Sequence, residues 1–342
     1  MLQYNSKQVQ PGDTFVAIPG TKVDGAEFIP RAIANGAKVI VAEKAVAVPS
    51  GVELRIVPSA RKALAEMAAE FYGHPSKKLK LIGITGTKGK TTVSYFIQSI
   101  LKTAGFKAEV IGTINSTLTT PESADLQREL ARMVKEGVTH CVLEVSSHAL
   151  MQERVHGCHF AVAIFTNLSH DHLDYHHSMA EYLRAKAKLF TMLDNNGIAI
   201  VNVDDPASQA IIAVVKGEVV SYGLGQAKHE LRDTKHNEYD TDVSAIDIRE
   251  DEMSLMINSL EVRTPLIGRH NAYNIAAAWQ CGLILGIRPL VIKRGIEAVK
   301  VIPGRQEKID CGQPFVVIVD FAHSPDSLQK LLETYKPLTE GK

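Results

Sequence analysis

The sequence has few cysteines, no long apolar run and no excess of either charge. Its four cysteines are scattered, without a Cys-x-x-Cys pair: Cys141, Cys158, Cys281 and Cys311. We therefore predict that most are reduced core residues, and we expect neither disulfides nor a cysteine zinc site. No apolar stretch approaches the roughly 20 residues that span a bilayer, and the amino-terminal MLQYNSKQVQ lacks the apolar core of a signal peptide. These absences predict a cytoplasmic protein with no membrane partner.

The charge balance narrows the range of partners further. Lys+Arg and Asp+Glu both number 38, so the formal net charge is zero. This balance argues against nucleic acid or an anionic membrane surface as the main partner. The composition is that of a globular protein, with 45% hydrophobic residues, and a length of 342 residues suggests two or three domains.

Short β-rich apolar runs alternate with amphipathic helical stretches, which predicts an α/β protein with mostly parallel sheets. Residues 1–78 contain the predicted strands TFVAI and KVIVAE, a helix that ends at Gly73, and a linker, HPSKK. Residues 79–302 contain the strands LKLIGIT, HCVLEVS, FAVAIFTN and GIAIVNVDD. Residues 226–267 are polar and then alternate, as in SAIDIR and SLMINSLEVR, which predicts an antiparallel edge.

Residues 303–342 form a third block with a linker, PGRQEK, then the strand FVVIVDFA and the helix SPDSLQKLLETY. One strand and one helix cannot bury a core of their own. We therefore predict an incomplete third domain, whose strand has no sheet partner and which is mobile or associates with a partner chain that completes it.

The segment GITGTKGKTT between Gly83 and Thr92 has the context of a phosphate loop, because a strand precedes it and the helix TTVSYFIQSILKTAG follows. Its spacing is shorter than the common G-x-x-x-x-G-K-[ST] pattern, with Ile84 where the first glycine would stand. Backbone N–H groups of such a loop face phosphate oxygens. Lys90 is then expected to reach the β- and γ-phosphates and Thr91 to hold Mg²⁺; the alternative is a glycine-rich turn with an incidental Lys and Thr. The predicted ATP-binding residues of the loop are Gly86, Thr87, Lys88, Gly89, Lys90, Thr91 and Thr92.

The shortened loop resembles that of the Mur ligase superfamily, whose usual form is GT-N-GKTT, with Lys88 here in place of Asn. Further segments resemble successive landmarks of the same family in order: TTPESADLQ, EVSSHALMQERV, FTNLSHDHLDYHHSMAEYLRAKAKLF, GRHNAYNIAAA, PGRQE and DFAHSPDSL. EVSSHAL together with TTP is similar to the ligases that add the third residue of the peptidoglycan stem peptide, the MurE type. The resemblance implies a small α/β UDP-sugar-binding domain (1–78), a central parallel-sheet ATPase domain (79–302) and the start of a Rossmann-like ligase domain (303–342).

The implied activity is ATP-dependent ligation. A diamino acid, meso-diaminopimelate or L-lysine, is joined to UDP-N-acetylmuramoyl-L-alanyl-D-glutamate through an acyl phosphate, with ATP and Mg²⁺. Two alternatives stay open: a ligation-deficient module that binds nucleotide or UDP-muramoyl-peptide and acts with a partner, and another ligase of the superfamily, such as a folylpolyglutamate synthase. Because the family's third domain normally continues further and carries the motif that grips the diamino acid, we expect this chain alone to make little tripeptide.

Four residues are predicted to carry the chemistry: Lys90, Glu144, His172 and Lys186. Glu144 ends the apolar strand HCVLE, at the edge where doubly wound sheets bind ligands; it is a candidate Mg²⁺ ligand or simply a solvated strand end. His172 matches the family's metal-ligand histidine, although the histidine-rich segment around it leaves a zinc site as an alternative. Lys186 matches a family lysine carried as a carbamate (N6-carboxylysine), which can bind Mg²⁺; the sequence alone favours a surface lysine beside Lys188.

Further site residues follow from the resemblance. The muramoyl-dipeptide is expected at Thr119, Thr120, Ser146, Gln152 and Arg154, and uridine at Ser6. Asn271 and Asn274 match the adenine edge, and their alternative role is a helix cap with a turn. Arg305 and Asp320 match residues that the third domain brings to ATP.

Overall fold

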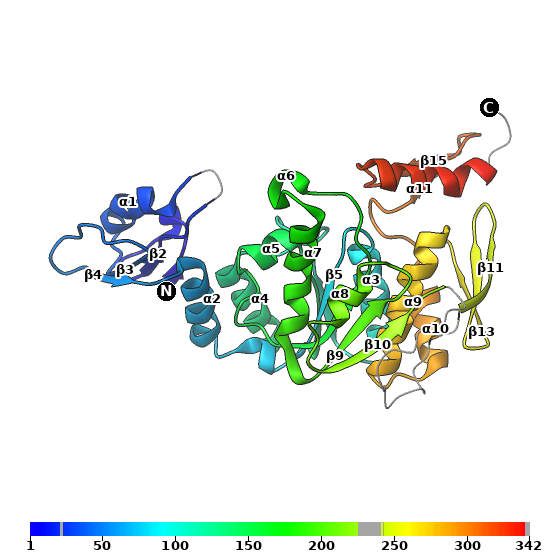
Figure 1. Ribbon diagram of the computed structural model, residues 1–342, viewed down its shortest axis with the longest axis horizontal. Helices are drawn as coiled ribbons and strands as arrows, with labels where there is room; N and C mark the ends of the chain where they lie inside the picture. Colours follow the sequence, from blue (N-terminus) through cyan, green and yellow to red (C-terminus); the bar gives the residue numbers. More distant parts are fainter. Residues whose placement is uncertain (21–22, 225–240, 242, 339–342) are drawn as a thin grey trace. The chain divides into compact units, whose positions relative to one another are not determined.

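The computed structural model describes residues 1–20, 23–224, 241 and 243–338. The chain divides into two compact units that are not consecutive in sequence (Figure 1). The first unit consists of residues 1–78, 120–136 and 148–158, and the second of residues 79–119, 137–147 and the chain from residue 159 onward. The division into three consecutive domains stays a prediction.

The first unit is built on a small parallel sheet. Its strands lie in the order β1 (Leu2–Gln3), β2 (Thr14–Val16), β3 (Val39–Ala42) and β4 (Glu53–Ile56). Its helices of one turn or more are α1 (Ile29–Ala34), α2 (Ala60–Phe71), α4 (Ser123–Lys135) and most of α5 (Ser147–Met151). Helix α2 begins where Ser59 accepts a hydrogen bond from the amide of Lys62, and it buries an apolar stripe that includes Ala60, Leu64 and Ala68.

The second unit is a doubly wound parallel sheet of six strands. In spatial order these are β10 (Glu218–Tyr222), β9 (Leu193–Asn202), β8 (Phe160–Phe165), β5 (Lys80–Thr85), β7 (His140–Glu144) and β6 (Ala108–Ile111). All neighbouring pairs are parallel. Because both faces of β5, β7 and β8 are covered, their sequences are continuously apolar rather than alternating. The predicted α/β class is therefore confirmed.

Helices of this unit surround its parallel sheet or pack on the helices that do. They are α3 (Lys90–Thr103), α6 (Leu173–His176), α7 (Met179–Ala187), α8 (Ser208–Ile212), α9 (Arg269–Ile284) and α10 (Pro289–Glu297). Helices α3, α9 and α10 pack against one another, and α3 and α9 also contact strands of the sheet (Figure 1). Trp279 of α9 lies fully buried in this core. Helix α3 is thereby fixed over the sheet, and its first residue belongs to the phosphate loop.

Gly295 of α10 gives a test of this packing. A Cβ atom at this position would lie 2.5 Å from the Cα of Ile100 in α3, so valine cannot fit unless the two helices separate. We expect Gly295→Val to lower the free energy of unfolding by about 1–3 kcal/mol, the usual cost of overpacking, as measured by denaturant unfolding. The control is Arg294→Val, which places the same side chain on the exposed face of the helix. Equal unfolding free energies for the two variants would contradict the close crossing.

The predicted antiparallel segment forms a three-stranded sheet. Its strands are β11 (Val243–Ile248), β12 (Met253–Ile257) and β13 (Leu260–Thr264). Asn258 and Ser259 both adopt positive φ, as in the tight turns that match strand twist, so SLMINSLEVR is a hairpin of two strands. The polar residues 225–240 of the predicted edge lie outside the described residues.

The carboxyl-terminal segment corrects two predictions. PGRQEK is not wholly a linker, because β14 (Glu307–Ile309) begins within it and pairs antiparallel with β15 (Val317–Val319). The predicted strand therefore has a partner, supplied by a segment too short to show alternation. Helix α11 (Pro325–Tyr335) begins at a capping box of Ser324 and Ser327. Tyr335 packs against the core of the second unit, which gives this segment a hydrophobic contact that its own two elements cannot provide.

Among the described residues, no helix is both long enough and apolar enough to cross a membrane. Three of the cysteines are buried free thiols, as predicted for most of them, and Cys311 is exposed.

Candidate functional site

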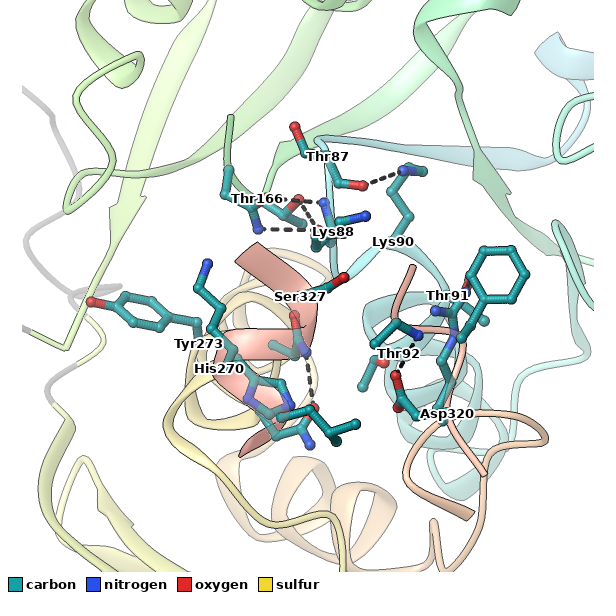
Figure 2. Close-up of a pocket in the computed structure, with 18 of the residues that line it drawn as sticks. Thr87, Lys88, Lys90, Thr91, Thr92, Thr166, His270, Tyr273, Asp320 and Ser327 are labelled. Atoms are coloured by element: carbon teal, nitrogen blue, oxygen red, sulfur yellow. Dashed lines mark hydrogen bonds between the residues drawn. The ribbon is translucent and has the colours of Figure 1, made fainter. Parts of the chain in front are cut away.

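The candidate site lies in the second unit, where the strand order reverses around β5. The loops that follow β5, β7 and β8 meet at the carboxyl edge of the sheet, the usual ligand position in doubly wound folds. A cavity of about 910 Å³ opens there. Figure 2 shows Thr87, Lys88 and Lys90 on one side of this cavity, with His270 and Asp320 across from them.

The loop after β5 requires glycine at two positions. A Cβ at Gly86 would lie 1.9 Å from Thr166 Oγ1, and one at Gly89 would lie 2.4 Å from Asn274 Oδ1. Gly89 also has φ of 89°, which disfavours other residues, and it stands directly before α3. The loop therefore turns tightly into the amino terminus of a helix, where backbone N–H groups favour an anion.

The loop is fastened by the segment that follows β8. Thr166 Oγ1 donates to the carbonyl of Lys88 at 2.7 Å. The amide of Thr87 donates to the carbonyl of Asn167 at 2.8 Å, and the amide of Lys88 donates to its Oδ1 at 2.9 Å. The sequence analysis did not predict these hydrogen bonds. The polar pair Thr166 and Asn167, directly after an apolar strand, was a signal that could have indicated them.

Lys90 is held inside the loop that it is predicted to serve. Its Nζ donates to the carbonyl oxygen of Gly86 at 2.8 Å and to that of Thr87 at 3.1 Å (Figure 2). Burial lowers the pKa of Lys90 to about 8, against the opposing effect of the Glu144 carboxylate. An anion that entered the loop would find this ammonium already positioned at its centre.

Thr91 and Glu144, two of the predicted Mg²⁺ ligands, lie together. Thr91 Oγ1 donates to Glu144 Oε2 at 2.9 Å, and Thr113 Oγ1 donates to the same oxygen at 3.0 Å. Arg305 Nη2 in turn donates to Thr91 Oγ1 at 3.1 Å. Glu144 is buried, so the interpretation as a solvated strand end is wrong. Clustered hydroxyl and carboxylate oxygens are the donors that Mg²⁺ prefers.

His172 and Lys186 both lie near the ring of Tyr182. Lys186 Nζ is 4.2 Å from the centre of the Tyr182 ring, and the His172 ring centre is 6.0 Å from it. Lys186 is 1% exposed, so it is not a surface lysine, and among the described residues it forms no salt bridge. Burial and then the nearby Lys90 charge hold the pKa of Lys186 well below its ordinary value, which favours a neutral amine.

The histidines of this segment do not converge on a zinc site. His176 is buried and its Nε2 lies 2.8 Å from Ser147 Oγ, while the His172 side chain is 44% exposed. Across the described ranges, no group of three or more His, Cys, Asp or Glu side chains is arranged to hold a metal. His172 has φ of 53°, a strained backbone of the kind that clusters at functional sites.

The predicted adenine residues form a connected buried group. Asn274 Nδ2 donates to Asn271 Oδ1 at 3.0 Å, and Asn271 Nδ2 donates to Gln306 Oε1 at 3.1 Å. Asp320 Oδ2 accepts from the amide of Gln306 at 2.8 Å. Gly268, not either asparagine, is the cap of α9, so the helix-cap alternative is wrong. His270 and Gln306 complete this side of the cavity, and the sequence did not single them out as site residues.

The predicted substrate residues are distributed over the two units. Thr119 and Ser146 line the cavity of the second unit. In the first unit, Arg154 Nη1 donates to the carbonyl of Thr120 at 3.0 Å and its Nη2 to Gln152 Oε1 at 2.7 Å. Its Nε lies 3.0 Å from a carboxylate oxygen of Glu122, a partner that the sequence did not suggest. Ser6 is buried in the first unit.

The fold and the cavity define a nucleotide-binding protein with a phosphate loop. Two family models match the chain: the Mur ligase middle domain over residues 84–282, and the Mur ligase family catalytic domain over residues 1–72. The UDP-N-acetylmuramoyl-L-alanyl-D-glutamate--2,6-diaminopimelate ligase of Bacillus licheniformis is 40% identical, with all of this chain and 71% of that protein covered. The chain belongs to the Mur ligase family, as the sequence predicted.

Solved structures agree with this assignment. A UDP-N-acetylmuramoyl-L-alanyl-D-glutamate--2,6-diaminopimelate ligase superposes with a TM-score of 0.80 at 26% identity, covering 100% of this chain and 71% of that one. A MurF ligase from Thermotoga maritima in complex with ADP gives a TM-score of 0.70 at 22% identity, covering 100% of this chain and 75% of that one. The second likeness bears on the fold alone, and both confirm the predicted Mur ligase architecture.

Proposed function

We propose that this chain catalyses ATP-dependent ligation at the third step of the stem peptide, in the cytoplasm. The acceptor is UDP-N-acetylmuramoyl-L-alanyl-D-glutamate, and the added residue is a diamino acid, for which the curated relatives' names give 2,6-diaminopimelate. The observation that carries the proposal is the convergence, in one cavity, of Lys90 inside a phosphate loop and the adjacent Thr91 and Glu144 oxygens.

The chemistry needs two anions to meet, ATP and a carboxylate. The carboxylate oxygen attacks the γ-phosphorus of ATP and ADP leaves, giving an acyl phosphate. The amine of the diamino acid then attacks the carbonyl carbon, phosphate leaves, and the amine loses a proton. A cation and fixed dipoles that face the transferring phosphoryl group stabilise the charge that develops there.

Residues of this chain could bind the phosphates, the metal ions and the adenine base that this reaction requires. Lys90 and the amino terminus of α3 stand where the phosphates would lie. Thr91 and Glu144 would hold one Mg²⁺, and His172 and a carbamate on Lys186 would contribute a second set of ligands near the same loop. When bound, Mg²⁺ neutralises phosphate oxygens and polarises them toward attack. The buried Asn271, Asn274 and Gln306 group offers amide donors and acceptors to the edge of a base.

The test is ADP release from Mg²⁺-ATP in the presence of the UDP-linked dipeptide, with hydroxylamine added to trap an acyl phosphate as a hydroxamate. This readout does not depend on how the diamino acid is held. We expect dipeptide-dependent ADP and hydroxamate, but none with the UDP-linked monopeptide. Addition of diaminopimelate or L-lysine then reports tripeptide synthesis. If the chain binds ATP and dipeptide but forms neither ADP nor hydroxamate, it is a binding module and the proposed ligation is wrong.

A further inference from the structure

The side chain of Lys88 adds a second ammonium at the phosphate end of the cavity. Lys88, Lys90 and Asp171 all line this cavity. Lys88 Nζ lies 3.1 Å from Asp171 Oδ2, and the two side chains are 24% and 15% exposed, so the ion pair is partly shielded from water. The usual form of the loop that this one resembles has an uncharged Asn at the position of Lys88, so the side chain here adds a cation relative to that form.

The backbone of Lys88 is already engaged elsewhere. Its amide donates to Asn167 Oδ1, and its carbonyl accepts from Thr166 Oγ1 and from Asn167 Nδ2 at 3.1 Å. The amide of Thr87 is likewise taken by the Asn167 carbonyl. In phosphate loops such amides usually face the phosphates. In this arrangement residue 88 therefore has only its side chain to offer to a bound phosphate.

The charge of Lys88 affects two neighbouring titratable groups of the site, Asp171 and Lys90. Burial would raise the pKa of Asp171, but the hydrogen bond from Lys88 holds it below its ordinary value. After burial, the positive charges of Arg305 and then of Lys88 also lower the pKa of Lys90. A polyanion bound in the loop would give these cations a counter-charge.

We propose that Lys88 is a second phosphate-binding cation, which Asp171 holds in the nucleotide-free protein and which moves onto a β- or γ-phosphate oxygen when a nucleoside triphosphate binds. The inference rests on the proposed function, because it assigns a role within the same site. The exchange replaces one anionic partner with another, so the ammonium is never left uncompensated. It would make the site more selective for nucleotides that carry phosphates beyond the first.

The competing interpretation is a fixed ion pair that only ties the phosphate loop to the segment after β8. Titration calorimetry with ATP and with AMP separates the two. We expect Lys88→Asn to weaken ATP binding about tenfold, because a hydrogen bond to a charged group contributes at that level, and to leave AMP binding within about twofold. Lys102→Asn, an exposed change on α3, is the matched control.

Asp171→Asn provides a second test, because it removes the anionic partner of Lys88. We expect this variant to bind ATP more tightly than the parent protein, and we expect most of that gain to disappear in the double variant Lys88→Asn/Asp171→Asn. A fixed tie instead predicts that both single variants lose thermal stability and that neither changes the ATP-to-AMP affinity ratio. That result, or a gain from Asp171→Asn that persists undiminished in the double variant, would overturn the proposal.

The failure of this inference is distinguishable from failure of the proposed function. If the parent protein binds ATP and Lys90→Ala does not, while Lys88→Asn binds as the parent does, the phosphate site stands and only the role of Lys88 is wrong. If the parent protein shows no ATP binding, the proposed function itself is wrong.

Discussion

Lys90→Ala is expected to lower dipeptide-dependent ATP turnover by about 100-fold or more, the range seen when one preorganised charge-stabilising group is removed. Lys90 Nζ is bound by the carbonyls of Gly86 and Thr87 in the nucleotide-free protein, inside the loop that leads into α3. Alanine removes the cation that is held inside the loop, so the phosphate charge loses that direct partner.

Two measurements make this prediction specific. Calorimetry should show weakened ATP binding for Lys90→Ala, while circular dichroism and thermal unfolding stay close to those of the parent protein. Lys102→Ala, on an exposed part of the same helix, should retain both binding and turnover. Unchanged ATP affinity in the Lys90 variant would remove the phosphate-loop assignment.

Local patterns predicted the parts of this site that a single segment builds. The phosphate loop was recognisable because strand, glycines, Lys90 and helix are consecutive, and the structure places them in that order. Glu144 was found for a similar reason, since it ends a buried strand at the edge where the loops meet. Both inferences needed only the direction of the chain and the continuous apolar runs that indicate buried strands.

Contacts between distant segments were not predictable in the same way. Thr166 and Asn167 reach the phosphate loop because β8 lies beside β5. The order of strands in the sheet cannot be predicted from either segment alone. The strand that contains β15 was predicted, but its pairing was missed because the partner, β14, has only three residues, too few to show alternation. In both cases the contact depends on a segment that is distant in sequence, so local patterns do not predict it.

Lys186 shows where a usable signal was overlooked. The sequence alone suggested a surface lysine beside Lys188, but the structure buries it. Tyr182, Ala185, Lys186 and Leu189 follow helical spacing and are all buried, so the lysine stands within an apolar stripe. A lysine in such a stripe is rarely buried without a purpose, and that pattern separates Lys186 from its neighbour.

The carbamate on Lys186 can be tested directly. A neutral amine is required to attack CO₂, and burial and then the Lys90 charge hold the pKa of Lys186 well below its ordinary value, which favours that form. The new N–C bond gives a carbamate and releases a proton, so a neutral amine becomes an anion suited to Mg²⁺. We expect ¹³C NMR with labelled bicarbonate to show one carbamate signal, which disappears in Lys186→Ala and persists in Lys188→Ala.

We expect ATP turnover to depend on the carbamate at Lys186. Lys186→Ala is expected to lose about 100-fold or more in dipeptide-dependent ATP turnover, because an anionic metal ligand would be missing where phosphate charge must be balanced. The parent protein in CO₂-free buffer should lose activity and regain it when bicarbonate is added, whereas Lys186→Ala should not respond to bicarbonate. Because Lys186 is buried without a salt bridge among the described residues, alanine removes no ion pair, so a loss of turnover without a loss of folding points to the carbamate. Full turnover in CO₂-free buffer, with no carbamate signal, would show that Lys186 acts as a plain amine.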